Sequence, residues 1–384
     1  DGGLGRWPTM SISERVAAVE EFLTTMVAQR EQVVRLIMWE ISKTRADAEK
    51  EFDRTVKYIQ DTIKEALEIE AGTKNKKELQ GLTTSISRQP RGVTLCMGPF
   101  NYPLNETLTT VIPALIMGNT VIFKPAKYGV MLFEPLLKGL AESFPPGTVN
   151  VIYGDGQEVI SPLMKSGKID SLAFIGTARV AKILMSQHPE VHRLHLVLGL
   201  GAKNPAIIMN DADPEKAAKE IISGALSFNG QRCTALKLIF VPRKSADKYL
   251  AAINREIQGL KIGLPWEDGV QLTPLAEDGK VANMQEMIKD AHSKGSKTIN
   301  PGGGESIDSL MTPALLYPVD PSMRIFNEEQ FGPIVPVVPY DDIQEVIDYI
   351  KGSQYGQQAA LFSESPEKYS ELISALERLV ARVN

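Results

Sequence analysis

Only one of the two cysteines in the 384-residue chain lies where a thiol could act as a nucleophile. Cys233 falls in the polar stretch GQRCT (230–234), between a predicted helix over 214–228 and an apolar run over 236–241. A thiolate is the best nucleophile that a protein offers near neutral pH, provided that nearby dipoles or cations lower its pKa. A lone cysteine is more often a buried structural residue, and Cys96, inside an apolar run, fits that interpretation. We therefore expect covalent chemistry at Cys233.

Asn101 is a second candidate for chemistry. It lies in GPFNYP (98–103), where a predicted strand ends and a helix begins. The amide NH2 group of an asparagine can donate hydrogen bonds to a developing oxyanion without transferring a proton. Asparagine also suits the N-cap of a helix, so this motif is weak when taken alone.

Three further segments have the composition of ligand-binding turns. KPAK (124–127) follows a predicted strand, and open α/β sheets bind ligands at the carboxyl ends of their strands. FIGTAR (174–179) runs from a strand into a helix through a glycine, which suits a phosphate group. EEQFGP (328–333) places two acids in a turn, where a solvated charge pair is the usual explanation.

Two other patterns resemble ligand motifs only in part. Gly154-x-Gly156 lacks the third glycine of a dinucleotide fingerprint, so it predicts a turn. His192-x-x-His195 has no third ligand nearby in the sequence, and we expect no metal site.

Hydrophobic periodicity predicts the elements that position these residues. The first third of the chain has helical spacing, with a capping box at Ser11 and Glu14 and a later amphipathic helix that contains Phe52. From residue 93 onward, short β-rich runs alternate with helices, which predicts right-handed βαβ units and a parallel sheet. The predicted strands cover 93–97, 120–124, 149–153 and 171–175, and the predicted helices 104–117, 131–143, 214–228, 246–258, 279–294, 342–351 and 366–379.

Composition excludes several classes of protein. Hydrophobic residues make up 43% and charged residues 23% of the chain, which is ordinary globular composition. A net charge of −5 argues against a nucleic-acid partner, and no apolar run approaches the length of a membrane span. Two cysteines cannot form a disulfide framework, so we expect a cytoplasmic protein. Organelle targeting stays open because the chain begins at Asp1 without a methionine.

Taken in order, these segments resemble the aldehyde dehydrogenase superfamily. The matching motifs are PFNYP, KPA, FIGT, GAKNP (201–205), GQRCT and EEQFGP, and the resemblance runs from Trp7 to Asn384. Within the superfamily, GQRCTALK (230–237) is most similar to the NADP-dependent, non-phosphorylating glyceraldehyde-3-phosphate dehydrogenases.

The resemblance implies an α/β fold with two main domains. A Rossmann-type parallel-sheet domain for the cofactor would comprise residues 1–82 and 95–200, including the N-terminal helices, and an α/β catalytic domain residues 201–384. Residues 83–94 would form an oligomerisation arm or hairpin, and the protein would be a homodimer or homotetramer. Relatives usually continue beyond the last residues of this chain, so we expect that the C-terminal end is missing.

The resemblance also implies a role for each site residue. Cys233 would attack the aldehyde carbonyl, while the Asn101 side chain and the Cys233 backbone N–H would hold the oxyanion. Hydride transfer to the nicotinamide would leave a thioester, which water hydrolyses. The positions matched to the cofactor, NADP with NAD as the alternative, are Lys124, Lys127, Gly176, Thr177, Glu329 and Phe331. The candidates for the substrate are Arg54, Tyr102 and Arg232, and the two arginines are candidates for its phosphate because guanidinium groups match phosphate geometry. The implied reaction oxidises glyceraldehyde 3-phosphate to 3-phosphoglycerate.

Two departures from the family pattern affect this interpretation. Gly199 stands where many members have the glutamate that activates the hydrolytic water, and no carboxylate is near it in the sequence. Ala178 and Ala181 replace residues that are often Thr and Gly in the pyrophosphate turn. Two alternatives therefore stay open: an aldehyde dehydrogenase of another kind, such as one that passes the acyl group to coenzyme A, and a catalytically impaired structural subunit.

Overall fold

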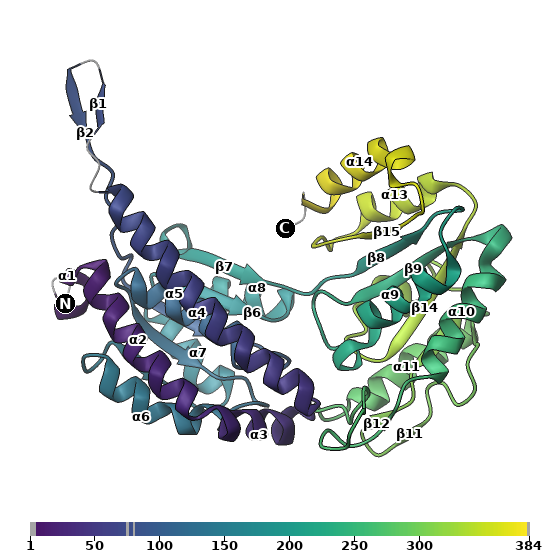
Figure 1. Ribbon diagram of the computed structural model, residues 1–384, viewed down its shortest axis with the longest axis horizontal. Helices are drawn as coiled ribbons and strands as arrows, with labels where there is room; N and C mark the ends of the chain where they lie inside the picture. Colours follow the sequence, from purple (N-terminus) through teal and green to yellow (C-terminus); the bar gives the residue numbers. More distant parts are fainter. Residues whose placement is uncertain (1–4, 74–76, 80, 382–384) are drawn as a thin grey trace. The chain divides into compact units, whose positions relative to one another are not determined.

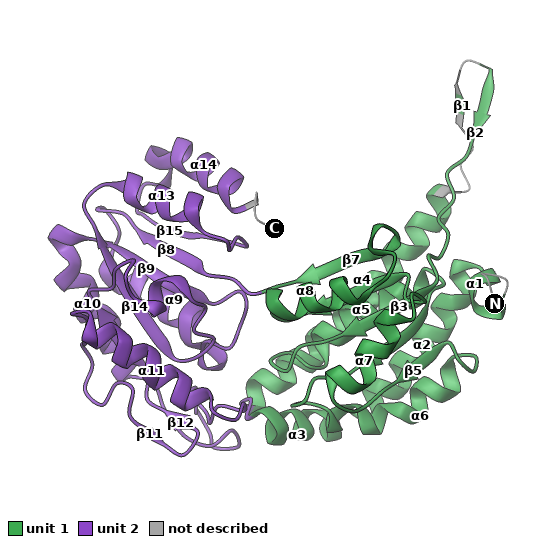
Figure 2. Ribbon diagram, turned by 180° about the vertical axis from the view of Figure 1, so that it is seen from behind, with its two compact units in different colours: residues 1–41, 45–200 green, residues 42–44, 201–384 purple. Residues whose placement is uncertain are grey.

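The computed structural model describes residues 5–73, 77–79 and 81–381. The chain divides into two compact units, shown in Figures 1 and 2: unit 1 is Asp1–Ile41 with Arg45–Leu200, and unit 2 is Ser42–Thr44 with Gly201–Asn384. Each unit is built around its own, largely parallel sheet. Among the described residues, none of the helices combines the length and the apolar character that a bilayer span requires.

Unit 1 contains a five-stranded parallel sheet in the order β5-β4-β3-β6-β7. From β3 the chain adds β4 and β5 on one side, and then β6 and β7 on the other side. This reversal of strand order is typical of the Rossmann-type fold, so the predicted parallel sheet is confirmed. The strands are β3 (Val93–Met97), β4 (Thr120–Lys124), β5 (Val149–Val151), β6 (Ser171–Ile175) and β7 (His195–Gly199).

Helices cover both faces of this sheet. Leu95 and Leu172 pack in one buried cluster with apolar residues of α7 and α8. Side chains alternate along a strand, and the neighbouring Thr94 and Ala173 lie on the opposite face, beside α5. The helices of unit 1 are α1 (Arg6–Thr9), α2 (Ile12–Ala28), α3 (Arg30–Ile41), α4 (Arg45–Thr73), α5 (Asn105–Ile116), α6 (Glu134–Ser143), α7 (Gly156–Lys165) and α8 (Ala178–Gln187).

The start of α2 confirms the capping box predicted from the sequence. The Ser11 side chain accepts a hydrogen bond from the backbone N–H of Glu14, and the Glu14 carboxylate accepts one from the backbone N–H of Ser11. The apolar periodicity over 16–38 belongs to two helices, because the chain leaves helical geometry at Gln29 between α2 and α3. Buried Arg15 ties α2 to the end of α5 by donating to the Ile116 carbonyl at 2.7 Å.

The hairpin of unit 1 lies earlier in the chain than the predicted arm over 83–94. Strands β1 (Lys77–Leu79) and β2 (Leu82–Thr84) pair antiparallel, and Figure 1 shows the hairpin projecting beyond the end of α4. Gly81 turns the chain with φ +78°, a value that favours glycine. Residues 85–92 form neither helix nor strand. Because β2 is fully exposed, no alternation of buried and exposed residues marked it in the sequence.

Unit 2 contains a six-stranded sheet in the order β10-β13-β14-β9-β8-β15, in which only the β10–β13 pair is antiparallel. The central strands β9 and β14 are buried along their whole length, as expected for a sheet that helices cover on both faces. The strands are β8 (Asn204–Ile208), β9 (Leu236–Pro242), β10 (Lys297–Thr298), β13 (Ala314–Tyr317), β14 (Ile334–Tyr340) and β15 (Ala360–Phe362), and a separate ribbon is formed by β11 (Ser306–Ile307) and β12 (Leu310–Met311).

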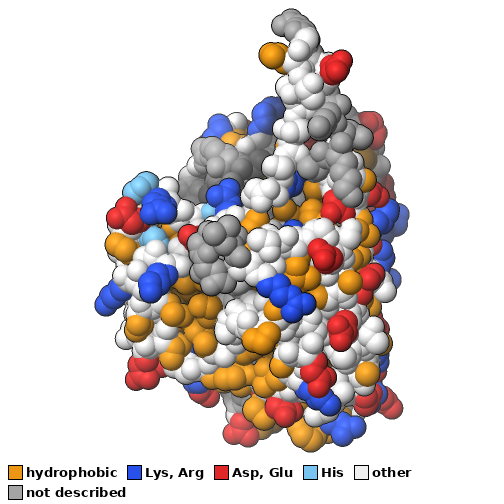
Figure 3. All heavy atoms as spheres, turned by 90° about the vertical axis from the view of Figure 1, so that its left-hand side faces the viewer, with side chains coloured by type: hydrophobic (Ala, Val, Ile, Leu, Met, Phe, Trp, Pro, Cys, Tyr) orange, Lys and Arg blue, Asp and Glu red, His pale blue; other side chains and the backbone are white. Residues whose placement is uncertain are grey.

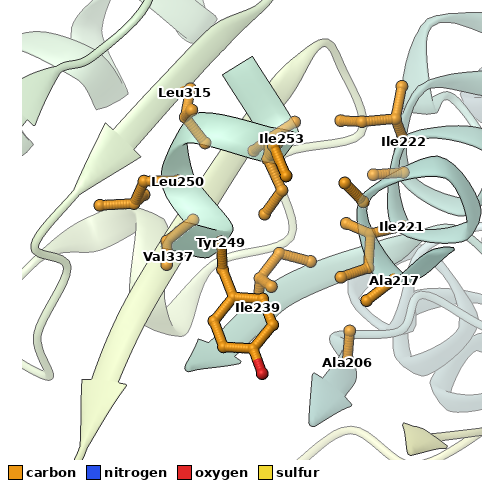
Figure 4. Close-up of a cluster of buried hydrophobic side chains, with 14 of the residues drawn as sticks. Ala206, Ala217, Ile221, Ile222, Ile239, Tyr249, Leu250, Ile253, Leu315 and Val337 are labelled. Atoms are coloured by element: carbon orange, nitrogen blue, oxygen red, sulfur yellow. The ribbon is translucent and has the colours of Figure 1, made fainter. Parts of the chain in front are cut away.

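Two hydrophobic cores pack against this sheet. One joins the sheet to α9 and α10, and Figure 4 shows Ile221 of α9 and Ile253 of α10 in it. The buried hydroxyl of Tyr249 in this core donates to the carbonyls of Met209 and Ala212. The other core joins the sheet to α11, α13 and α14. The helices of unit 2 are α9 (Pro214–Leu226), α10 (Ala246–Gln258), α11 (Lys280–Ser293), α12 (Arg324–Asn327), α13 (Ile343–Gly352) and α14 (Ser370–Ala381).

Two observations concern the charged side chains of the described residues. Within residues 5–73, 77–79 and 81–381, no three His, Cys, Asp or Glu side chains gather in a way that could hold a metal ion. On the face drawn in Figure 3, Lys and Arg side chains lie among Asp and Glu side chains. That face therefore lacks the continuous positive charge that binds a phosphate backbone.

Candidate active site

In unit 1, three of the predicted site segments lie at one edge of the sheet. Met97 at the end of β3 pairs with Lys124 at the end of β4 and with Phe174 of β6. The turns that follow these three strands contain Asn101, Lys127 and Gly176, respectively. Strand order reverses between β3 and β6, and a crevice at the carboxyl ends of such strands is where α/β sheets bind ligands.

Asn101 lies in the turn between β3 and α5 and is 5% exposed. The N-cap residue of α5 is Leu104, so Asn101 does not have the capping role that was its structural alternative. The first N–H groups of α5 are bound instead by Glu51 of α4, whose carboxylate accepts from the backbone of Leu104 at 3.0 Å and of Asn105 at 3.1 Å. A buried side chain of α4 thus fixes the start of α5, directly after the Asn101 turn.

The turn after β4 presents two lysines in different environments. Lys124 is half-buried and donates to the Pro125 carbonyl, and burial lowers the pKa of its ammonium group while Asp155 opposes that shift. Lys127 is exposed, and its ammonium lies 4.9 Å from the centre of the Tyr128 ring. Glu40 of α3 anchors the end of this turn, because its carboxylate accepts from three successive backbone N–H groups at 130–132.

The turn after β6 leads directly into α8. Thr177 is the N-cap of α8, and its hydroxyl accepts from the backbone N–H of Val180 at 3.3 Å. Gly176 donates its N–H to the Gly199 carbonyl at 2.9 Å, which joins this turn to the end of β7. Ala181 is buried in the core under α8. The free N–H groups and the dipole at the N-terminus of α8 favour an anionic ligand here.

Of the substrate candidates in unit 1, Tyr102 lies next to Asn101 and is half-buried, whereas Arg54 is exposed on α4. Arg54 follows the capping residue Glu51 by three positions, so it lies one helical turn further along α4. Arg54 on α4 and Tyr102 in the turn before α5 therefore belong to two segments that the hydrogen bond from Leu104 to Glu51 links.

In unit 2, the candidate site residues lie at the amino ends of their strands, whereas those of unit 1 lie at the carboxyl ends. Lys203 directly precedes β8, and Cys233, Phe331 and Gln357 lie three residues before β9, β14 and β15; these strands are neighbours in the order β14-β9-β8-β15. The amino ends of four adjacent parallel strands therefore bring these segments together. Gln357 was not predicted from the sequence, because a glutamine in a loop has no distinctive chemical signature.

Cys233 follows a loop with unusual backbone geometry. Phe228, Asn229 and Gly230 have φ values of +48°, +56° and +71°. A Cβ atom at Gly230 would lie 2.7 Å from the Ala225 carbonyl oxygen, so only glycine fits. Asn229 stabilises the loop by exchanging hydrogen bonds with the backbone of Thr273. Strained residues of this kind concentrate at functional sites.

The peptide that contains Cys233 is held from two neighbouring strands. The Asn204 amide at the start of β8 donates to the Cys233 carbonyl at 2.7 Å and to the Ala235 carbonyl at 3.0 Å. The Gln358 amide donates to the Thr234 carbonyl at 2.6 Å. Arg232 donates to the hydroxyls of Ser227 and Thr234, so part of its guanidinium group shapes this loop. The Cys233 side chain is left partly exposed.

Lys237 is a buried cation close to the nucleophile. Its ammonium donates to the Gly230 carbonyl at 3.0 Å, lies 3.6 Å from Glu329 Oε1 and lies 4.7 Å from the centre of the Phe331 ring. Burial lowers the pKa of Lys237 to about 8, and the charges of Glu329 and Cys233 oppose that shift. The site therefore places a positive charge beside the thiol and the glutamate.

Lys203 holds the segment that contains Glu329. Its buried ammonium donates to the carbonyls of Ile325 and Glu328 and to Gln330 Oε1, at 2.6–2.7 Å. Burial, with the nearby Lys237 charge, lowers the pKa of Lys203 well below its ordinary value. Glu329 Oε1 is itself buried; within the described part of the chain it forms the 3.6 Å ion pair with Lys237 and has no partner at hydrogen-bond distance. It can therefore accept a hydrogen bond from a ligand.

The two cysteines should differ strongly in reactivity. Burial raises the pKa of Cys96 to about 12, and the Cys96 side chain is inaccessible within β3. We expect iodoacetamide at neutral pH to alkylate Cys233 much faster than Cys96, because the thiolate is the reacting species. Peptide mass spectrometry after timed quenching measures both rates. Equal labelling of the two cysteines in folded protein would contradict the assignment of Cys233, and unfolded protein, in which both thiols are exposed, is the control.

Comparison with known proteins agrees with this architecture. The model of the aldehyde dehydrogenase family matches residues 2–384. The chain belongs to the aldehyde dehydrogenase family, whose members are oxidoreductases.

Several relatives share one enzyme name. The chain is 31% identical over 369 residues to the NADP-dependent glyceraldehyde-3-phosphate dehydrogenase of Streptococcus equinus, covering 93% of this chain and 75% of the relative. The structure of NADP-dependent glyceraldehyde-3-phosphate dehydrogenase from Bacillus halodurans, complexed with NADP, has a sequence 33% identical to this chain and a TM-score of 0.88. The match covers 97% of this chain and 78% of the Bacillus chain. The structure of betaine aldehyde dehydrogenase from Staphylococcus aureus has a sequence 26% identical to this chain and a TM-score of 0.89. The match covers 97% of this chain and 74% of the betaine aldehyde dehydrogenase chain. The fold is therefore shared by enzymes that are named for different aldehydes.

Proposed function

We propose that this protein oxidises glyceraldehyde 3-phosphate to 3-phosphoglycerate with NADP, through a thioester on Cys233. The observation that carries the proposal is the placement of Cys233. Its thiol is partly exposed after a strained loop, its peptide is fixed by Asn204, and a buried ammonium group, that of Lys237, lies nearby. The names of the relatives supply the substrate and the cofactor.

The residues present fit a dinucleotide cofactor. The N-terminus of α8 behind Gly176 and Thr177 would hold the pyrophosphate, and Lys124 would donate to a ribose hydroxyl. Glu329 Oε1 would accept from a second hydroxyl, which would satisfy a buried oxygen that otherwise makes no hydrogen bond. Phe331, beside Glu329, would line the same site. NADP, when bound, supplies the oxidant that accepts a hydride from the substrate.

The chain's own groups would perform the covalent steps. The Cys233 thiolate adds to the aldehyde carbon, and the new oxyanion accepts hydrogen bonds from the Asn101 amide and the Cys233 backbone N–H. After oxidation, the carbon and the sulfur are joined as a thioester, which water cleaves to the acid and the free thiol. Arg54 and Arg232 are the proposed contacts for the substrate phosphate, with Arg232 using donors not committed to its own loop, and Tyr102 is a further proposed contact for the substrate.

In this proposal unit 1 is the cofactor-binding domain and unit 2 the catalytic domain. We further propose a cytoplasmic homodimer or homotetramer. Sedimentation velocity measures the oligomeric state directly, and a monomer at micromolar concentration would contradict that part of the proposal.

Gly199 favours one second candidate, an enzyme that passes the acyl group to coenzyme A. Gly199 ends β7 and has no side chain to deprotonate water. An acceptor that attacks as a thiolate would not need that base.

An assay of NADPH formation separates the two functions. Absorbance at 340 nm is followed with glyceraldehyde 3-phosphate and NADP, with and without coenzyme A. Turnover without coenzyme A supports the hydrolytic reaction, and turnover that depends on coenzyme A supports the second candidate. The same assay with betaine aldehyde tests the choice of substrate. Absence of NADPH with every aldehyde, in protein that labels fully at Cys233, would support the impaired structural subunit.

Lys127 is expected to determine the preference for NADP. Its exposed ammonium should attract the 2′-phosphate, so Lys127→Glu should weaken the binding of NADP at least about tenfold more than the binding of NAD. Fluorescence titration with both cofactors measures the two losses. Lys138→Glu makes the same charge change on the exposed face of α6, where Lys138 faces Glu142, and is the control. Equal losses for NADP and NAD would show that Lys127 points to solvent.

A further inference from the structure

Gln357 is in contact with the nucleophile. Its side-chain amide donates a hydrogen bond to Cys233 Sγ, at an Nε2 to Sγ distance of 3.7 Å. The two residues lie 124 positions apart and meet because β15 and β9 flank β8 in one sheet. The roles implied by the family resemblance include no residue at this position.

The segment around Gln357 is held firmly against the nucleophile peptide. The neighbouring Gln358 donates its backbone N–H to Asn204 Oδ1 at 3.3 Å and its side-chain amide to the Thr234 carbonyl. Asn204 in turn binds the Cys233 carbonyl. These bonds link the amino ends of β15, β8 and β9, and they hold Gln358, the residue next to Gln357, against the peptide that contains Cys233.

The other end of the Gln357 amide is unsatisfied. Its Oε1 atom is buried and has no hydrogen-bond partner in the part of the chain that the structure describes. An unpaired buried acceptor is destabilising, so such atoms usually have a water or a ligand as partner. Gln357 also lines a cavity of about 10 Å³ with Asn204 and Tyr355, on a side of the loop that Cys233 does not line. That volume is enough for about one water molecule.

We propose that Gln357 is a catalytic residue that binds and orients the water that hydrolyses the thioester on Cys233. The proposal rests on the proposed function, because it requires an acyl group on the sulfur. Once the sulfur is acylated, it is a poor acceptor, so Nε2 is released and the amide can turn its Oε1 atom toward a water beside the thioester. Gln357 Oε1 accepts a hydrogen bond from that water and directs its oxygen to the carbonyl carbon.

The step balances without any additional reagent. The water oxygen forms a bond to the thioester carbon, the carbon–sulfur bond breaks, and its electron pair stays on Cys233. Of the two water protons, one reprotonates the sulfur or passes to solvent, and the other leaves the carboxylic acid product to solvent. An amide neither gains nor loses a proton near neutral pH, so Gln357 supplies orientation and not base catalysis. Orientation of this kind can reduce a barrier substantially.

The test compares two substitutions of Gln357 with a matched control, in the full chain with NADP and glyceraldehyde 3-phosphate. Rapid mixing separates a burst of NADPH, which reports formation of the thioester, from the slow phase, which reports its hydrolysis. Gln357→Met removes both polar ends, and we expect a burst amplitude like that of the wild type and a slow phase about tenfold slower. Gln357→Glu adds a proton acceptor at the same place. We expect its slow phase to be about 10²-fold faster, with a slower burst because the new charge opposes the thiolate. Gln354→Met, the same change at an exposed position three residues earlier, should alter neither phase.

Each outcome has a defined meaning. A slow phase unchanged in both Gln357 variants, with an intact burst, would overturn the proposal. If Gln357→Met fails to fold, as judged by near-ultraviolet circular dichroism, Gln357→Glu decides alone: a faster slow phase supports the proposal and an unchanged or slower one overturns it. Failure of the proposed function is separate, because wild-type protein would then form neither NADPH nor a thioester detectable by mass spectrometry, or would complete turnover only when coenzyme A is added.

Discussion

Cys233→Ser is expected to reduce turnover at least 10³-fold while leaving the affinity for NADP nearly unchanged. The substitution replaces one atom, and the bonds that position the peptide go to the backbone carbonyls of residues 233 and 235, which the substitution does not change. The loop should therefore keep its shape. A serine hydroxyl is far less ionised than a thiol near neutral pH, so the covalent step is lost.

Steady-state NADPH formation and cofactor titration measure the two quantities on the same sample. Mass spectrometry of the intact protein after mixing with substrate should show an acyl adduct on the wild type and none on the variant. Cys96→Ala is the matched control, because it removes the other thiol from the buried strand β3 and should leave turnover intact. Residual turnover in Cys233→Ser above about one tenth of the wild-type rate would contradict the assignment of the nucleophile.

Gly199→Glu is expected to accelerate hydrolysis of the thioester by about 10²–10⁴-fold, the usual contribution of a general base. The wild type should show a burst of about one NADPH per active site, followed by slow turnover. The backbone at Gly199 does not require glycine, because its φ is outside the left-handed region. A Cβ atom there would meet the Ile175 side chain at 3.2 Å, a close contact that small side-chain shifts relieve.

Rapid-mixing kinetics measures the burst and the slow phase separately. The new carboxylate should change only the slow phase, since the burst precedes hydrolysis. Gly199→Gln has the same size without a base and is the control that should leave the slow phase slow. A linear progress curve for the wild type, in protein that labels fully at Cys233, would show that hydrolysis is not limiting and that a base already acts in the site.

The sequence predicts the sheet of unit 1 well and its periphery less well. The predicted strands 93–97, 120–124 and 171–175 coincide with β3, β4 and β6, because each is an apolar run bounded by Gly, Pro or Asn. Strand β5 ends at residue 151 instead of 153. Strand β7 was not predicted, since it forms the edge of the sheet and alternates between exposed and half-buried side chains. Helix α7 was also missed, where the sequence indicated only a turn at 154–156.

Candidate site residues could be named from the sequence where the residue type and its context indicate a chemical role. Cys233 and Asn101 stood out by composition and context, and their catalytic roles stay predictions. In the structure Cys96 is the buried thiol, and Leu104, not Asn101, is the N-cap of α5. Gln357 and Lys237 could not be assigned roles from the sequence. Gln357 is distinguished only by its contact with the sulfur of Cys233, which the sequence does not show. Lys237 is distinguished only by its burial among Glu329, Gly230 and Phe331.

The wide separation of the partners of Cys233 along the chain has a consequence for biosynthesis. A ribosome makes the thiol 124 residues before the amide that binds it, and Lys203 precedes its partner Gln330 by 127 residues. The amino ends of β9 and β8 therefore emerge long before β14 and β15 complete the sheet beside them. During translation Asn204 can bind the Cys233 peptide early, but the contacts from Gln357 and Gln358 are still missing. Those contacts form only after residues 357 and 358 have left the exit tunnel.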